Sequence, residues 1–128
     1  MPKRVLETPS APNALGPYSV AVRAGDLVFV SGQVAIDPAT GERAPDDVTV
    51  QARLIMKNLK AILADVGLTM TDVAKTTIFL ADINDFAAVN EVYGGYFGDE
   101  HPARSTVQVG ALPGGFLVEI EVIASRSY

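Results

Sequence analysis

The sequence predicts an α+β fold in which two helices pack on one face of a mixed sheet. Two segments carry apolar residues at helical spacing, and the segments around them are rich in β-branched and aromatic residues. Each expected helix has a single apolar stripe, so both helices bury it on one side of the sheet. The other side needs a different cover, for which self-association is the simplest candidate. With 128 residues, the chain is expected to form a single domain over residues 1–128.

Strands and loops are expected over the first third of the chain. Residues 3–7 are compatible with a short edge strand, after which prolines and glycines keep the chain in a loop. Residues 18–23 and 27–31 predict the two strands of a hairpin, joined by a turn at residues 24–26. Residues 37–41 contain the Asp, Pro and Gly that start and close tight turns.

Two helices are expected in the middle of the chain. Residues 48–66 carry apolar side chains at helical spacing, acidic residues precede them, and Gly67 is suited to end the helix. A second helix is expected over residues 84–97. Its apolar face is formed by Phe86, Val89, Tyr93 and Phe97.

Three further strands complete the pattern. Residues 73–81 predict a buried strand because β-branched and aromatic side chains dominate it. Residues 106–111 and 116–124 predict two more strands, with a Pro-Gly-Gly turn at residues 112–115 between them. The order of elements is therefore strands, helix, strand, helix, strands.

Composition excludes several classes of function. The net charge of −5 disfavours binding to nucleic acid and to anionic membranes, because the field of the protein repels phosphate. The chain has no cysteine and one histidine, His101, which excludes disulfides and thiolate chemistry and leaves no metal site by motif. No secretion signal or membrane-spanning run is apparent, so we expect a soluble cytoplasmic protein.

Two charged residues are the strongest candidates for chemistry. Glu119 alternates with apolar residues in the last strand, on the same face as Glu121. Glu119 could lie in water, or it could line a cleft where burial would raise its pKa and suit it to proton transfer. Arg104 is expected in the loop 102–105, just before a strand that we expect to lie antiparallel to the Glu119 strand. It could be a surface arginine, or it could hold a substrate carboxylate with its fork of donors.

Three other residues have both a structural and a functional interpretation. Gly32 follows Ser31 at a strand end and could let a ligand approach the backbone. A serine hydrolase is not supported, because the nucleophile-elbow motif is missing. Tyr18 follows a rigid Gly-Pro turn and could be a core, interface or pocket residue. Asn90 could be a helix-surface amide or face the buried stripe of the second helix.

An ordered set of short motifs resembles the reactive intermediate deaminase A (RidA) family over residues 14–125. Each motif is weak alone, but their order along the chain is specific. The motifs include Gly16-Pro17-Tyr18-Ser19, Ser31-Gly32-Gln33, Asp37-Pro38-x-Thr40-Gly41, Gln51-Ala52, Asn58-Leu59, Lys75-Thr76-Thr77, Val89-Asn90-x-x-Tyr93, Pro102-Ala103-Arg104-Ser105 and Glu119-Ile120-Glu121.

The resemblance implies a chorismate-mutase-like fold and a homotrimer with a central barrel and sites between subunits. It also implies hydrolysis of 2-imino acids to 2-keto acids and ammonia, with no cofactor or metal. The substrates would be 2-iminobutanoate and 2-iminopropanoate, formed from enamines such as 2-aminoacrylate that pyridoxal-phosphate enzymes release. Endoribonuclease activity, ascribed to some relatives, and a non-catalytic metabolite-binding or chaperone-like trimer are the alternatives.

The resemblance also assigns roles to individual residues. Arg104 would bind the substrate carboxylate, and Glu119 would position water and move protons. Tyr18 and Asn90 would line the pocket, with Gly32 and the backbone of Thr106 close to the ligand. The family often has cysteine at the position of Thr106. If that position acts through its backbone, we expect threonine to serve equally well.

Overall fold

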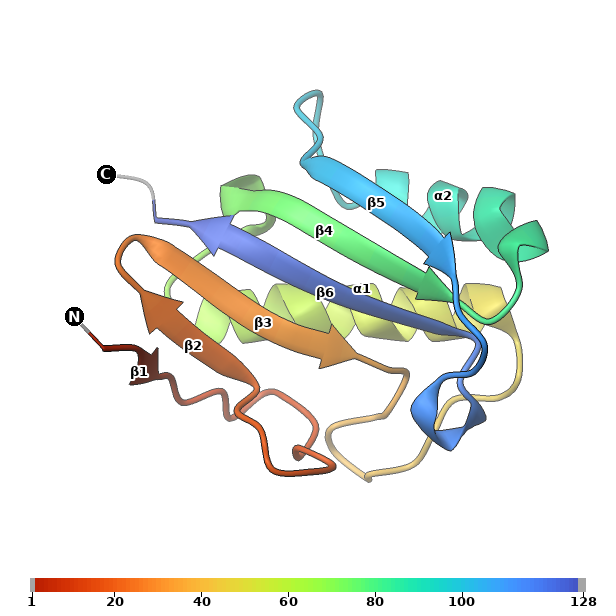
Figure 1. The fold of residues 1–128 in the computed structure, drawn as a ribbon, viewed down its shortest axis with the longest axis horizontal. Helices are drawn as coiled ribbons and strands as arrows, with labels where there is room; N and C mark the ends of the chain where they lie inside the picture. The colour runs from red at the N-terminus through yellow and green to blue at the C-terminus, as the bar shows by residue number, and fades with distance from the viewer. Residues whose placement is uncertain (1, 127–128) are drawn as a thin grey trace.

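The computed structural model describes residues 2–126 as one six-stranded sheet with two α-helices (Figure 1). The strands are β1 (Arg4–Val5), β2 (Ala21–Ala24), β3 (Leu27–Gln33), β4 (Val73–Leu80), β5 (Ala103–Gln108) and β6 (Val118–Ser125). The helices are α1 (Val48–Asp65) and α2 (Phe86–Gly94), with short 3-10 turns η1 (Met70–Asp72), η2 (Ile83–Asp85) and η3 (Pro113–Gly115).

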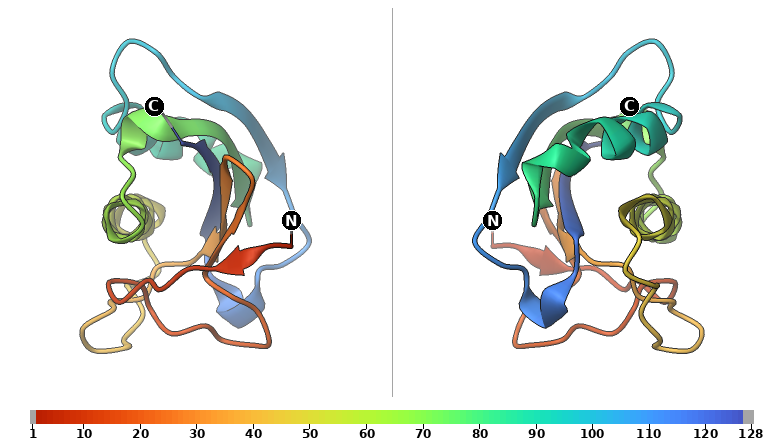
Figure 2. Two further views of the ribbon diagram at one scale, coloured as in Figure 1. Left: turned by 90° about the vertical axis from the view of Figure 1, so that its left-hand side faces the viewer. Right: turned by 90° about the vertical axis from the view of Figure 1, so that its right-hand side faces the viewer.

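The sheet is mixed, as the sequence predicts. Its strand order is β1-β2-β3-β6-β4-β5, and only β4 and β5 run parallel. Both helices lie on the same side of this curved sheet (Figure 2). The expected α+β fold, with two helices on one face of a mixed sheet, is therefore confirmed.

The expected position of Arg104 is wrong in two respects. β5 begins at Ala103, so Arg104 lies within a strand and not in a loop. β5 pairs with β4 in parallel, and β4 separates it from β6. The physical reason is the crossover through α2, which returns the chain to the starting end of β4 and so makes the next strand parallel. Arg104 and Glu119 are therefore not on adjacent strands.

Element ends also differ from the sequence-based expectations. β2 begins at Ala21 and not at residue 18, because the Gly-Pro turn keeps Tyr18 in the loop, where its N–H donates to the Gly16 carbonyl at 2.8 Å. α2 ends at Gly94, three residues before the expected end, in keeping with the poor helix propensity of the Gly94-Gly95 pair.

Helix α1 is determined by local signals. The Asp47 side chain caps it by accepting from the N–H groups of Thr49 at 2.9 Å and Val50 at 3.2 Å. Beyond its C-cap, Gly67 has φ +80°, a conformation that favours glycine. The fully buried face of the helix packs on the sheet and carries the expected apolar stripe, Ala52, Ile55, Leu59, Ile62 and Leu63.

The opposite face of the sheet has no helix over it (Figure 2). Phe29 on β3 and Val107 on β5 are 37% and 43% exposed. Their cross-strand neighbours are also apolar, since Phe29 pairs with Ile123 and Val107 with Phe79. An apolar sheet face of this kind fits contact with another protein surface. Among residues 2–126, no helix is long and apolar enough to span a membrane.

Candidate functional site

A pocket of about 440 Å³ opens beside Glu119 on the sheet face away from the helices. It brings together three of the expected site residues, Tyr18, Gly32 and Glu119. The remaining lining comes from the loop before β2, the end of β3 and the turn η3, through Leu15, Gly16, Pro17, Ser31, Val34 and Pro113.

The carboxylate of Glu119 lies against the backbone of Gly32. A Cβ atom at residue 32 would lie 2.8 Å from Cδ of Glu119, and closer still to Oε2. The pairing of β3 with β6 is irregular between Val30 and Gln33, which brings this part of β3 into the pocket wall. A side chain at this position would therefore displace the Glu119 carboxylate from the place that it occupies here.

The setting of Glu119 changes its acidity. Partial burial of its carboxylate raises the pKa above the usual value, and the negative charge of Glu121 raises it further. A carboxyl group with a raised pKa can accept and return a proton closer to neutral pH. The geometry therefore suits Glu119 to general acid-base chemistry in this pocket.

Tyr18 forms part of the pocket rim. Its side chain is 46% exposed, and its hydroxyl accepts a hydrogen bond from the Leu15 N–H at 3.1 Å. The ring also lies close to Gly16, where a Cβ would be 3.6 Å from Cδ2 of the ring. The loop thus orients the ring at the mouth of the pocket and leaves its hydroxyl proton available for donation.

A second cluster surrounds Arg104 on the helix side of the sheet. Its guanidinium carbon Cζ lies 5.0 Å from the ring centroid of Tyr93 and 5.4 Å from that of Phe86, both on α2. The hydroxyls of Tyr93 and Thr76 share a hydrogen bond of 2.7 Å. Burial raises the pKa of Tyr93, although the Thr76 bond and the charge of Arg104 partly oppose it.

No carboxylate among residues 2–126 forms a salt bridge with the guanidinium of Arg104. Within the described residues 2–126, the single recorded salt bridge joins Arg43 to Asp46. Arg104 is half-buried on an aromatic surface, so a charged group there is partly shielded from water. This combination suits the binding of an external anion, with which the planar fork of donors can form two hydrogen bonds.

Asn90 and Thr106 lie on the same side of the sheet as Arg104. Residues 86, 90 and 93 are spaced by about one helix turn, which places half-buried Asn90 on the face of α2 beneath the guanidinium. Thr106 is two residues after Arg104 in β5, so both point to one face. Its Oγ1 is buried and has no hydrogen-bond partner in the described chain.

The two clusters lie on opposite faces of the sheet. Arg104 pairs with Thr76, whose side chain contacts α2. Glu119 pairs with Phe79, three residues along β4 and therefore on the other face. One chain thus brings together Tyr18, Gly32 and Glu119, and separately Asn90, Arg104 and Thr106. It does not bring Arg104 to Glu119.

Several residues of these clusters, among them Phe86, Tyr93 and Pro113, were not identified from sequence as site residues. Phe86 and Tyr93 were expected on the apolar face of a helix, but their stacking on Arg104 depends on how α2 packs on β5. Pro113 was expected only in a turn, yet it lines the Glu119 pocket. The helical spacing of residues 86, 90 and 93 was the one sequence signal that could have grouped Phe86 and Tyr93 with the site residue Asn90.

A larger groove of about 780 Å³ lies between α1 and α2, and none of the expected site residues lines it. Arg53, Lys57 and Glu91 give it mixed charge. Among residues 2–126, no three His, Asp or Glu side chains form a cluster that could hold a metal ion.

Comparisons with known proteins cover nearly the whole chain. Residues 8–126 match a protein family described as endoribonuclease L-PSP. A mouse protein named 2-iminobutanoate/2-iminopropanoate deaminase is 48% identical over 122 residues, which are 95% of this chain and 90% of the mouse protein.

Solved structures are similar over the same range. Escherichia coli TdcF with bound serine is 48% identical, with a TM-score of 0.90 over 97% of this chain and 99% of TdcF. RidA from an Antarctic Psychrobacter is 41% identical, with a TM-score of 0.92 over 96% of this chain and 99% of that protein. The agreement in fold therefore covers nearly the whole chain.

Proposed function

Because this chain belongs to the RidA, or endoribonuclease L-PSP, family, we propose that it is a deaminase that hydrolyses 2-imino acids to 2-keto acids and ammonia. The observation that carries the proposal is the pocket beside Glu119, where a carboxylate with a raised pKa lies against Gly32. The mouse relative supports 2-iminobutanoate and 2-iminopropanoate as substrates, the latter formed from 2-aminoacrylate.

The complete site is built from two subunits on this proposal. Arg104 lies on the edge strand β5, within reach of a neighbouring molecule, and Glu119 opens to the sheet face that the helices leave uncovered. A homotrimer whose sheets face inward as a central barrel would cover Phe29 and Val107. It would also place Arg104, Asn90 and Thr106 of one subunit beside Tyr18, Gly32 and Glu119 of the next.

The reaction needs orientation and proton transfer. Arg104 holds the substrate carboxylate, which directs the imine carbon towards Glu119. Glu119 takes a proton from water as the water oxygen bonds to that carbon, and the C=N electron pair moves to nitrogen. Glu119 then returns a proton to the nitrogen. Glu119 then moves the proton of the new hydroxyl to the same nitrogen, so that the C–N bond breaks, the C=O bond of the ketone forms and ammonia leaves.

The other site residues act on the bound substrate. Tyr18 donates its hydroxyl proton to the ligand at the rim, and Asn90 offers an amide beside the carboxylate-binding arginine. Thr106 contributes through its backbone, where threonine and cysteine are equivalent. Imine hydrolysis by this protein would show that no thiol is required at that position.

A coupled assay tests the proposal. An amino-acid oxidase supplies the 2-imino acid, and semicarbazide competes for it while imine loss is followed. We expect the protein to accelerate hydrolysis, and Arg104→Ala to lower kcat/KM by roughly 10- to 150-fold or more, because a charge-assisted contact is lost. Arg53→Ala, on the exposed face of α1, should match the parent protein. No acceleration by the parent protein would refute the deaminase.

The family description favours RNA cleavage as a second candidate. The net charge of −5 opposes an extended RNA-binding surface. Incubation of the protein with a single-stranded RNA distinguishes the two activities. Cleavage that persists in Arg104→Ala and Glu119→Gln would place a nuclease outside the proposed site. A trimer that binds 2-keto acids but hydrolyses nothing would support a non-catalytic binding role.

A further inference from the structure

The wall of the Glu119 pocket at Pro113 belongs to a turn with little stiffness of its own. Pro113, Gly114 and Gly115 are exposed, and both glycines have positive φ values, +76° and +72°. Two successive glycines leave a turn many alternative conformations. The flanking residues Leu112 and Phe116 are buried, so the ends of the turn are anchored while its tip is not.

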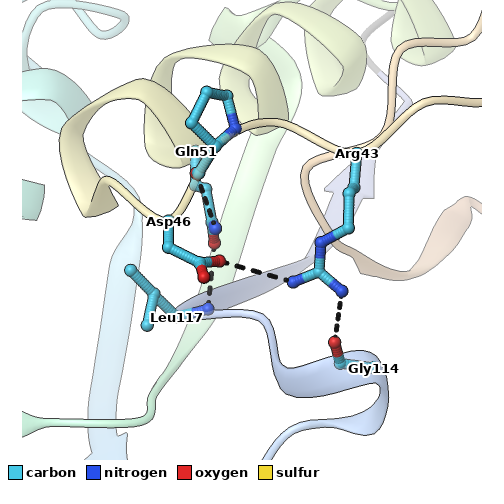
Figure 3. A network of polar contacts seen from close by, with 6 residues as sticks. Arg43, Asp46, Gln51, Gly114 and Leu117 are labelled. Atoms are coloured by element: carbon cyan, nitrogen blue, oxygen red, sulfur yellow. Dashed lines mark hydrogen bonds and ion pairs between the residues drawn. The ribbon is translucent and has the colours of Figure 1, made fainter.

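Arg43, which does not line the pocket, contacts this tip through Gly114 (Figure 3). One arm of its guanidinium donates a hydrogen bond to the carbonyl of Gly114, and the other lies 3.7 Å from Oδ1 of Asp46. Cζ lies 4.2 Å from the ring centroid of Phe116, the anchored residue after the turn. The ion pair between Arg43 and Asp46 is exposed and contributes little to stability, so the contacts of Arg43 with Gly114 and Phe116 position the turn.

Gln51 supports the same connection from the core. Its fully buried amide donates to the Pro45 carbonyl at 3.0 Å and accepts from the Leu117 N–H at 2.9 Å. The segment that carries Arg43 and the chain that follows the turn are therefore joined through one side chain, as Figure 3 shows. A buried amide satisfied on both sides leaves neither segment free to shift alone.

The pocket surface beside this turn is mostly apolar. Its apolar lining comes from Leu15, Pro17, Val34 and Pro113, and Glu119 lies at the end of the pocket where the reaction is proposed to occur. A 2-imino acid held by its carboxylate and attacked beside Glu119 must place its own side chain against apolar lining. The position of Pro113 then determines how large that side chain can be.

We propose that Arg43 is a positioning residue that holds the Pro113 wall and thereby sets the size of the imino-acid side chain that the pocket accepts. The inference rests on the proposed function, since it concerns the same pocket. Arg43 is not among the residues that line the pocket, so the proposal gives it no contact with the substrate.

The test compares Arg43→Met with the parent protein on a small and a bulky substrate, 2-iminopropanoate and 2-imino-4-methylpentanoate. Methionine keeps an apolar side chain of similar length beside Phe116 but cannot donate to Gly114. We expect the ratio of kcat/KM for the small substrate to that for the bulky one to fall about tenfold, the scale of discrimination by pocket shape. Arg43→Lys, which can still donate to Gly114, should restore part of the ratio.

Arg53→Met is the matched control, because it makes the same replacement on α1 away from the pocket. It should leave the substrate ratio unchanged. If the parent protein hydrolyses imines and Arg43→Met keeps the parental ratio, the positioning role is wrong while the deaminase stands.

Amide hydrogen exchange tests the positioning without any catalysis. We expect the N–H groups of Gly115 and Leu117 to exchange faster in Arg43→Met than in Arg53→Met, since the turn loses its outer anchor. Equal exchange in the two variants would overturn the inference whatever the assay shows. If the parent protein does not hydrolyse imines, faster exchange would leave Arg43 as the anchor of the turn but refute its role in substrate size.

Discussion

At the scale of single residues, the ionised carboxylate of Glu119 destabilises the folded protein but is suited to proton transfer. Its carboxylate is partly withdrawn from water and lies near the charge of Glu121, so its protonated form is favoured in the folded protein. Gly32 leaves room for the carboxyl group in this position, since a side chain there would push the end of Glu119 aside. The pocket therefore contains a group whose proton affinity is set by packing.

The raised pKa of Glu119 predicts a pH-dependent gain in stability for Glu119→Gln. Below the unfolded pKa the carboxyl group is protonated in both the folded and the unfolded state, so its ionisation does not affect the free energy of unfolding. As pH rises through the window between the unfolded pKa and the raised folded pKa, ionisation destabilises the folded protein. Urea unfolding at fixed protein concentration should show Glu119→Gln gaining stability over the parent protein as pH rises above the unfolded pKa of the carboxyl group.

Glu91→Gln corrects for the general effect of removing one negative charge, because Glu91 is exposed on α2. If both variants differ from the parent protein by the same amount at every pH, the explanation by burial is wrong. Deaminase activity of Glu119→Gln should be lost throughout, since the amide cannot take a proton from water.

At the scale of elements, α2 serves as an aromatic support for β5. Phe86 and Tyr93 lie under the guanidinium of Arg104, and the Tyr93 hydroxyl is held by Thr76 on β4. The parallel pair β4 and β5 and the crossover helix between them thus orient one side chain. Stacking on rings restricts the guanidinium without supplying a negative charge, which leaves its donors for an anion.

Tyr93→Phe should destabilise the protein by about 1–3 kcal/mol, because it leaves the buried hydroxyl of Thr76 without its partner. Adding Thr76→Val removes that unpaired hydroxyl, so the double variant should recover part of the loss. Urea unfolding of the single and double variants measures the coupling. Tyr96→Phe is the control, since no hydrogen bond of its hydroxyl occurs among residues 2–126. Additive effects of the two changes would contradict the role of this bond.

At the scale of the whole molecule, the sheet separates the two halves of the proposed site. Arg104 lies on the helix side at the edge strand, whereas Glu119 lies on the uncovered side. A single copy cannot present both to one small substrate. A neighbour that covers the apolar face would supply the missing half, which links assembly to catalysis.

Mixing two impaired variants tests the shared site. In trimers formed from equal amounts of Arg104→Ala and Glu119→Gln chains, about a quarter of the sites would combine an intact Arg104 with an intact Glu119. Arg104→Ala alone should keep roughly a tenth of the parental activity or less, Glu119→Gln alone should have none, and co-assembled chains should recover up to about a quarter of it. Unmixed trimers combined without subunit exchange are the control. No recovery in mixed trimers, verified by mass, would show that the two residues do not act across an interface.

Local signals in the sequence determined most of the secondary structure and the class of fold of this protein. The apolar stripe and the caps of α1 lie within one segment, so residues 48–66 were predicted to within one residue of the observed helix. The hairpin of β2 and β3, the turn before β6 and the class of fold also follow from neighbours along the chain. The ordered motifs pointed to the RidA family, which the family match confirms.

Tertiary structure alone decided how the candidate residues are grouped. Alternation along β5 and β6 shows which residues share a face within each strand, but not which face of the sheet that is. That choice depends on strand order and register, and here the crossover through α2 places β5 beside β4 and Arg104 under aromatic rings. Strand pairing joins residues far apart in the chain, so no local pattern could reveal that Arg104 and Glu119 lie on opposite faces.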